Sequence, residues 1–291
     1  MFLSIIEVLI IIVPFLLAIA FLTLAERKVI GSIQRRVGPN KVGYYGILQP
    51  FADGIKLFLK ETVLPSHSNK SLFLLAPILS LTISFFGWGV IPFGSGLTLS
   101  DLNLGIIYLL AISSFGVYGV IFSGWSANSK YAFLGSLRST AQIVSYEVVI
   151  GLVILIVILP STSLGLIKII EVQKSVWYII PLLPIALIFL ISVIAETNRA
   201  PFDLPEAESE LVAGFFTEHS SLAFAYFFLA EYLSIILMST LVSIFFLGGY
   251  IFPFLIIENS TFISLEALML GLKTCLILFI YIWVKLALKL N

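Results

Sequence analysis

The stretch LAFAYFFLAEYLSIILMSTLVSIFFLGG, residues 222–249, carries a single charged side chain, Glu231. A helix needs about 20 mostly apolar residues to cross the roughly 30 Å hydrocarbon core of a bilayer, and this stretch is long enough. Its apolar residues are continuous and do not alternate with polar ones, which excludes a strand of a membrane β-barrel. The stretch therefore predicts a membrane-spanning helix with a carboxyl group near its middle.

The rest of the chain repeats this pattern. Further apolar runs lie at 3–25, 72–93, 104–125, 143–160, 177–196 and 264–288. Of the 291 residues, 60% are hydrophobic and 11% are charged, whereas a soluble domain has about 25% charged residues. This composition excludes a soluble enzyme, a disordered chain and a nucleic-acid-binding protein. We expect an all-α polytopic membrane protein with about seven transmembrane helices in a single integral membrane domain, residues 1–291.

Positive charges gather on one side of these spans. Of sixteen Lys and Arg residues, eight lie in 26–71, two in 126–142, one in 197–221 and two at the C-terminus. The positive-inside rule therefore places these connections and the C-terminus on the cytoplasmic or matrix side, with the N-terminus outside. The first apolar run lacks a basic start and contains Glu7, so we interpret it as a retained span and not a signal peptide.

Residues that bind metals or redox centres are scarce. The chain has one cysteine, Cys275, and two histidines, His67 and His219. An iron–sulfur cluster needs several cysteine ligands, which this chain does not have. We therefore expect no metal and no prosthetic group here, and any redox centre must belong to a partner or be a diffusible molecule.

A helix lying at the membrane surface is predicted at 49–60. Phe51 and Ile55 share its apolar face and Asp53 lies on another, a pattern typical of an amphipathic interfacial helix. A basic anchor on anionic lipid explains the pattern about equally well, but it does not explain an acid among basic residues. We expect Asp53 and Arg36 to form a charge pair beside this helix.

The connection at 196–220 is rich in acids. Its charged groups include Glu196, Asp203, Glu206, Glu208, Glu210 and Glu218, with Arg199 as the one arginine. Glu206 and Glu210 are four residues apart, and like charges on one helical face raise the pKa of at least one carboxyl. This crowding favours a place where protons are held and exchanged. The alternative is a solvated acidic loop.

Three ionisable residues lie within the apolar runs. Glu231 and Lys273 are well inside their spans, where a charge costs about 2.5–3.5 kcal/mol to insert, so a functional role facing the protein interior is the default. Glu147 lies a few residues inside its span. For Glu147 taken alone, an acid placed near a helix N-terminus is a fair alternative.

Taken together, these segments resemble one family, the membrane subunit chain 1 of proton-pumping NADH:ubiquinone oxidoreductase, respiratory complex I, of the mitochondrial type. The matching segments are ERK at 26–28, QRRVGPN at 34–40, QPFAD at 49–53, GW at 124–125, SLRS at 136–139, SYE at 145–147, ETNRAPFDL at 196–204, Glu206, ESELV at 208–212 and AEY at 230–232. They run from the first span to the sixth, and several are too long to match by chance.

The resemblance implies roles for particular residues. The membrane side of a ubiquinone chamber would be formed by Arg27, Arg36, Phe51, Asp53, Lys56 and Phe228. A proton relay would be formed by Glu147, Glu196, Asp203, Glu206, Glu208, Glu210 and Glu231, with Arg199 as the charge partner. The matrix-side segments 26–71, 126–142 and 197–221 would contribute to both.

The resemblance also implies partners and a location. Ubiquinone would be the substrate, while NADH, FMN and the iron–sulfur clusters would belong to partner subunits. The partners would be two peripheral-arm subunits at the quinone site, one carrying the terminal iron–sulfur cluster, and the small and antiporter-like membrane subunits. The chain would lie in the lipid bilayer of the mitochondrial inner membrane, with its N-terminus in the intermembrane space and its C-terminus in the matrix.

The sequence departs from the family pattern in two places. Thr217 and His219 stand where the family usually has Asn and Tyr, and a histidine beside the acidic cluster would titrate near neutral pH. The family continues beyond its Trp-x-Arg motif with a loop and an eighth span, whereas here Trp283-Val284-Lys285 lies close to the last residue. We expect the eighth span to be dispensable or supplied by another polypeptide.

Two other classes of protein compete with an enzyme subunit. A stand-alone proton-coupled transporter would carry internal repeats with interrupted helices, and none is visible. An inert membrane anchor has no reason to bury Glu147, Glu231 and Lys273 at a cost.

Overall fold

Helices make up the regular structure of the chain. The computed structural model describes residues 2–203, 214–252 and 263–289. Its α-helices are α1 (Phe2–Ile33), α2 (Gln49–Leu59), α3 (Lys70–Phe86), α4 (Gly105–Ala127), α5 (Lys130–Ser161), α6 (Leu166–Val172), α7 (Leu183–Glu196), α9 (Ser221–Phe246) and α10 (Ile263–Lys289). Three short 3₁₀ helices are η1 (Tyr44–Gly46), η2 (Gly87–Val90) and η3 (Gly214–Phe216). The expected all-α class is confirmed.

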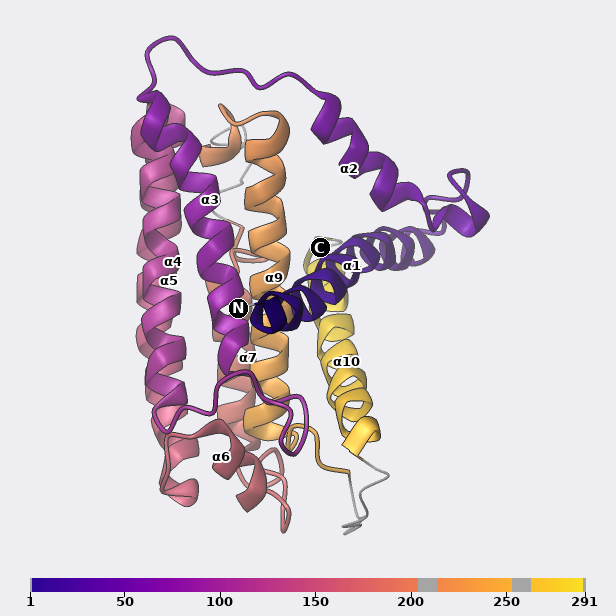
Figure 1. Cartoon of the computed structure of the whole chain (residues 1–291), viewed down its shortest axis with the longest axis vertical. Coiled ribbons are helices and arrows are strands. Elements are labelled where there is room, and N and C mark those ends of the chain that lie inside the picture. The colour runs from indigo at the N-terminus through magenta and orange to yellow at the C-terminus, as the bar shows by residue number, and fades with distance from the viewer. Residues whose placement is uncertain (1, 204–213, 253–262, 290–291) are drawn as a thin grey trace.

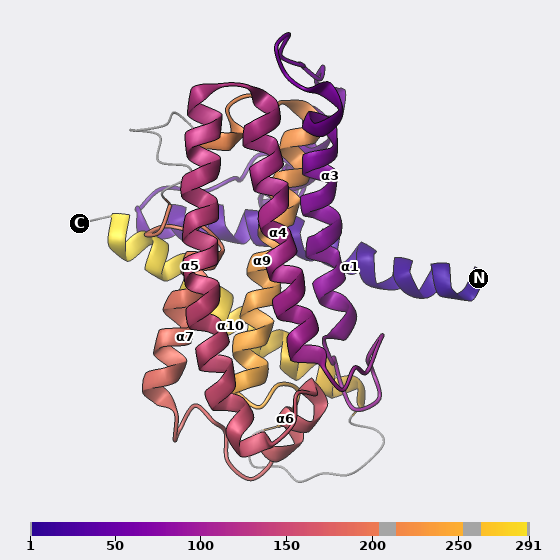
Figure 2. The same ribbon diagram turned by 90° about the vertical axis from the view of Figure 1, so that its left-hand side faces the viewer.

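Helix α9 forms the centre of a bundle with α3, α4, α5 and α7 (Figures 1 and 2). In its most apolar window 78% of the residues are buried, against 28–33% in the other long apolar helices. Leu233, Ile244 and Phe246 on α9 are fully buried in the main apolar core. The outer helices leave their apolar faces exposed, as expected where lipid replaces water.

Helix α1 lies across the bundle and not along it (Figures 1 and 2). It contacts α2, α9 and α10, so its last turns lie against the bundle interior. The crossing helix places two consecutive charged residues, Glu26 and Arg27, at the edge of the bundle.

The predicted spans compare well with these helices. Five helices among the described residues are long and apolar enough to cross a membrane: 70–90, 105–127, 130–161, 221–246 and 265–285. The span expected at 177–196 is a shorter helix, α7, which begins at Leu183. The run expected at 3–25 is α1, which extends to Ile33.

Helix α5 includes most of the expected connection 126–142, which is a difference from the prediction. The Ser129 side chain accepts a hydrogen bond from the Ala132 backbone N–H at 3.3 Å and caps the helix. Ser136, Ser139 and Gln142 are buried within the bundle. The polarity of these residues favours a loop when only the sequence is considered, but they form the inner face of a helix.

The amphipathic helix predicted at 49–60 is confirmed as α2. The Ser221 hydroxyl, at the start of α9, donates to the carbonyls of Leu57 at 3.1 Å and Lys60 at 2.7 Å. These bonds satisfy carbonyls at the end of α2, which otherwise lack partners within the helix. Phe58 is 68% exposed, so α2 is fixed to the bundle at one end and presents an apolar face outward.

Candidate functional site

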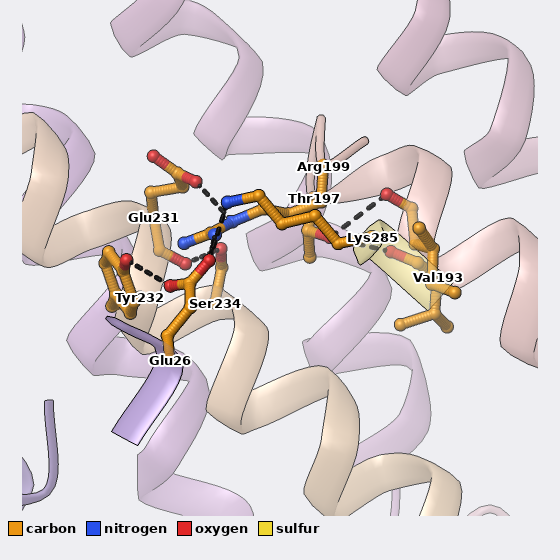
Figure 3. A network of polar contacts seen from close by, with 9 residues as sticks. Glu26, Val193, Thr197, Arg199, Glu231, Tyr232, Ser234 and Lys285 are labelled. Carbon is orange, nitrogen blue, oxygen red and sulfur yellow. Dashed lines mark hydrogen bonds and ion pairs between the residues drawn. The ribbon is translucent and has the colours of Figure 1, made fainter. Parts of the chain in front are cut away.

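Five side chains from four parts of the chain form a buried charge cluster, shown in Figure 3. Glu26 on α1 accepts hydrogen bonds from Arg199 at 2.8 Å, from Lys285 at 2.6 Å and from the Tyr232 hydroxyl at 2.6 Å. Arg199 also forms an ion pair with Glu231, at 2.8 Å between Nε and Oε1. We refer to Glu26, Arg199, Glu231, Tyr232 and Lys285 as the charge cluster.

The cluster is balanced in charge and well shielded from water. It holds two carboxylates and two cations, and Glu26 is only 6% exposed. The Arg199 guanidinium lies over the Tyr232 ring, 4.5 Å from its centroid, which adds a cation–π contact. Burial alone would lower the pKa of Arg199, but Glu231, Tyr232 and Glu26 outweigh burial and raise that pKa. Arg199 therefore stays charged.

Two carboxyl groups reach a cavity inside the bundle. The cavity has a volume of about 190 Å³ and lies between α3, α4, α5, α7 and α9. Glu196 and Glu231 line it, together with Asn198 and Ser234. A site with room for several waters and polar groups in its wall is one where water is stable.

Glu196 differs from the charge cluster in its surroundings. It ends α7, is 9% exposed, and among the described residues it has no ion-pair partner and no hydrogen bond to its Oε2 atom. Burying a carboxylate without a cation is costly, so this carboxyl is a natural place to hold a proton. Gln142 supports the chain beside it by donating to the Ala195 carbonyl at 2.7 Å and the Phe202 carbonyl at 2.8 Å.

Glu147 lies on α5 and faces α4. The Ser113 hydroxyl, which belongs to the cavity wall, approaches its Oε1 atom at 3.3 Å, and the Ser114 hydroxyl donates to the same atom. Glu147 is half-buried. Ser113 therefore connects this carboxyl with the cavity that Glu196 lines.

The rest of the predicted relay is only partly visible. Asp203 is half-buried in the turn after α7. Glu206, Glu208 and Glu210 lie outside the described residues. The structure thus brings Glu196 and Glu231 to one cavity, with Glu147 beside its wall.

The residues predicted to form a quinone chamber lie at the surface near α2. The Arg27 guanidinium pairs with Asp53 at 2.7 Å, and the Gln49 amide donates to the other oxygen of Asp53 at 3.1 Å. The expected pair of Asp53 with Arg36 is wrong. Arg36 follows α1 and bonds to Gln34 at 2.8 Å, so Arg27, one helical segment earlier, is the residue that reaches α2.

Three further predicted chamber residues are apolar or exposed. Phe51 packs edge-on against Phe21, with 6.3 Å between ring centroids, and Lys56 is exposed. Phe228 on α9 stacks beside Tyr232 of the charge cluster, at 4.8 Å. The described chamber residues are therefore spread from the α2 surface to the edge of the charge cluster.

His219 does not behave as the sequence predicted. Its ring stacks on Phe73 at 4.1 Å and meets the Phe227 ring edge-on at 5.0 Å. Burial among these rings lowers the pKa of His219 from its ordinary value of 6.5 to about 4. The imidazole is therefore neutral near pH 7 and is not a titrating neighbour of the acids.

Three members of the charge cluster were not predicted as site residues. Glu26 was part of a family motif, Tyr232 adjoins Glu231, and Lys285 was counted only as a positive charge near the C-terminus. The one local signal was an acid directly before two basic residues at the end of a span. The pairing of residues 26 and 285, which are 259 positions apart, has no local signature.

The structure defines an all-helical polytopic membrane protein whose interior holds a buried charge cluster and a carboxyl-lined cavity. A family model described as NADH dehydrogenase matches residues 6–289. The chain belongs to this family.

Close relatives are known from fungi, algae and bacteria. The chain is 59% identical over 283 residues to NADH-ubiquinone oxidoreductase chain 1 of Mycosarcoma maydis, covering 97% of this chain and 86% of the relative. It is 55% identical to the chain 1 protein of Chondrus crispus, covering 96% and 85%. A bacterial NADH-quinone oxidoreductase subunit, from Rhodospirillum centenum, is also 55% identical, with 96% and 82% covered. The family expected from the sequence, that of an enzyme subunit, is confirmed.

Proposed function

We propose that the chain is the core membrane subunit of a proton-translocating NADH:ubiquinone oxidoreductase in the mitochondrial inner membrane. It forms the membrane side of the ubiquinone chamber and the first carboxyl groups of a proton path. The observation that carries this proposal is the cavity lined by Glu196 and Glu231, because it joins the charge cluster to a buried carboxyl that has no cation.

The proton path runs through the bundle. Glu231 belongs to both the charge cluster and the cavity wall, Glu196 lines the same cavity, and Ser113 links the cavity to Glu147. Waters in the cavity carry protons between these carboxyls. Glu206, Glu208 and Glu210 extend the path on the matrix side, and Asp203 adjoins it.

The quinone reaction supplies the driving force. Reduction of ubiquinone to ubiquinol takes up two electrons and two protons, and the electrons come from a cluster in a partner subunit. The charge cluster is balanced before electrons arrive, so added negative charge in the chamber favours uptake of protons by nearby carboxyls. Release of quinol reverses that bias and lets protons move toward Glu147 and the neighbouring membrane subunits.

The chamber uses the matrix-side segments. Arg27 and Asp53 hold α2 against α1 at the membrane surface, and Phe51 and Phe228 provide apolar contact for a quinone and its tail. Residues 1–291 act as one membrane domain, with 26–71, 126–142 and 197–221 facing the peripheral-arm subunits. The N-terminus lies on the intermembrane-space side, and NADH, FMN and iron–sulfur clusters are held by partners.

Neutralising Glu231 in the whole complex tests this function. Glu231→Gln should lower quinone-linked NADH oxidation and proton pumping together by about tenfold or more, the scale of a lost proton-transfer group. A photoreactive ubiquinone analogue should label residues between 27 and 60 in the same preparation. Wild-type pumping in the assembled variant would remove Glu231 from the path, and labelling confined to other subunits would remove these residues from the chamber.

A further inference from the structure

Two buried polar atoms near the charge cluster have no hydrogen-bond partner among the described residues. They are the hydroxyl of Tyr281 on α10 and the Oε2 atom of Glu196 on α7. Tyr281 is 7% exposed and Glu196 is 9% exposed, so bulk water does not satisfy them. Buried polar groups are nearly always bonded, and an ordered water is a common partner when no protein group is in reach.

A second, smaller cavity adjoins Tyr281. Its volume is about 20 Å³, and Tyr281 lines it together with Glu26, Arg199, Tyr232 and Lys285 of the charge cluster. A water needs about 10–15 Å³ of such space and two to four polar partners. The cavity therefore has room for one water, and its wall offers a carboxylate, two cations and two phenolic hydroxyls.

On its other side, Tyr281 is close enough to Glu196 for the two groups to interact electrostatically. The charge cluster and Glu196 are thus separated by one phenolic side chain. Lys285 lies four residues after Tyr281, on the same face of α10, which directs both side chains toward the cluster.

We propose that the small cavity holds one ordered water, and that Tyr281 links this water to Glu196 as a positioning residue. The Tyr281 hydroxyl accepts a hydrogen bond from the water and donates toward Glu196 Oε2. Because the two atoms are not in direct contact, a water from the large cavity, which Glu196 lines, completes the bridge. This link deepens the proposed proton path and rests on it for its effect on pumping. It gives the charge cluster a second connection to Glu196, separate from that through Glu231.

Tyr281→Phe removes only the hydroxyl and keeps the buried ring. Tyr178→Phe is the matched control, because Tyr178 is 6% exposed and its hydroxyl also lacks a partner among the described residues, but it lies in the connection before α7. Three measurements on the whole complex are needed: water density in the small cavity, the infrared carboxyl band of Glu196 in redox difference spectra, and quinone-linked turnover. The band is assigned by its loss in Glu196→Gln.

We expect density for one water beside Tyr281 in the wild type and its loss in Tyr281→Phe. The Glu196 band should shift, and quinone-linked turnover should fall about fivefold, the effect of one lost hydrogen bond to a functional group. Tyr178→Phe should leave the band and the turnover unchanged.

Several outcomes would overturn the link: an empty small cavity in the wild type, an unshifted Glu196 band in Tyr281→Phe, or equal effects of the two tyrosine variants. Failure of Tyr281→Phe to assemble would also overturn it, since the hydroxyl would then be structural. The proposed function fails separately. If Glu196→Gln pumps normally while the water and the band shift are present, the link stands and the proton path does not pass through Glu196.

Discussion

Glu26 and Arg27 are neighbours in the sequence and differ in almost every physical respect. Glu26 is 6% exposed and bonds to Arg199, Lys285 and Tyr232, whereas the Arg27 side chain is 50% exposed and pairs only with Asp53 on α2. One turn of α1 thus contributes to a buried network and to a surface ion pair. The difference shows that burial, and not the presence of a salt bridge, decides how much a charged pair contributes.

The magnitudes follow from that difference. Removing one partner of a buried pair costs about 3–5 kcal/mol, because the other charge is left uncompensated in the interior. An exposed pair contributes about 0–1 kcal/mol, since water and salt screen it. The buried network is therefore suited to respond to charge changes in its neighbourhood, and the surface pair is suited to hold α2 in place.

The largest effect is expected for Glu231→Lys. The new cation would stand beside Arg199, which is now 2.8 Å from Glu231, and the cluster would hold three cations and one carboxylate. We expect loss of the assembled complex on native gels, because the penalty for each uncompensated buried ion is several kcal/mol. Glu231→Gln should still assemble. A lysine variant that assembles and pumps normally would show that Glu231 does not face the interior.

Glu26→Gln and Arg27→Gln compare the two regions directly. The first change leaves Arg199 and Lys285 with one carboxylate fewer and should destabilise the complex by about 3–5 kcal/mol. The second removes an exposed pair and should cost about 1 kcal/mol or less. The thermal midpoint of the solubilised complex measures both. Similar midpoints for the two variants would contradict the role given to burial.

The pH dependence of stability should contain a contribution from His219. Its pKa in the folded chain is about 4 and its ordinary value is 6.5, so the unfolded chain binds a proton first as the pH falls. The stability that comes from the neutral ring is complete above pH 6.5 and is lost between pH 6.5 and about 4, by about 1.4 kcal/mol per pH unit.

Replacing His219 by phenylalanine should remove that contribution. The difference in thermal midpoint between wild type and His219→Phe should grow as the pH falls from 7 to 5, with the variant less sensitive to acid. Parallel curves over this range would mean that the ring is not held neutral by burial.

The smallest effect on stability is expected at the surface. Asp53→Ala and Arg36→Ala should assemble normally, yet lower quinone reductase activity or inhibitor sensitivity, because both lie where a quinone would enter. Arg36→Lys should be milder but not silent if the planar guanidinium is used. Normal turnover and inhibitor response in assembled variants would remove both residues from the chamber.

The helices were largely predictable because hydropathy is a local property. The long apolar runs and the amphipathic α2 need only their own residues to be recognised. The extra turns of α5 were missed because Ser136, Ser139 and Gln142 are polar, and a polar face buried in a bundle looks like a loop in the sequence.

The site was predictable only where a residue carried its own cost. Glu231 was found because a carboxyl within a span is expensive wherever it lies. The partners of Glu26 were not found, because they come from three distant segments. His219 was misjudged for a similar reason, since the rings of Phe73 and Phe227 that hold it neutral are not its neighbours in the sequence.

The most direct test of the account is Glu196→Gln, measured against Glu171→Gln, which changes an exposed glutamate on α6. Quinone-linked NADH oxidation, proton pumping and NADH oxidation by an artificial acceptor should be recorded in the same membranes. We predict that Glu196→Gln lowers the first two together by about tenfold or more and leaves the third intact, while Glu171→Gln changes none. Unchanged pumping in Glu196→Gln, or an equal loss of artificial-acceptor activity, would contradict the account.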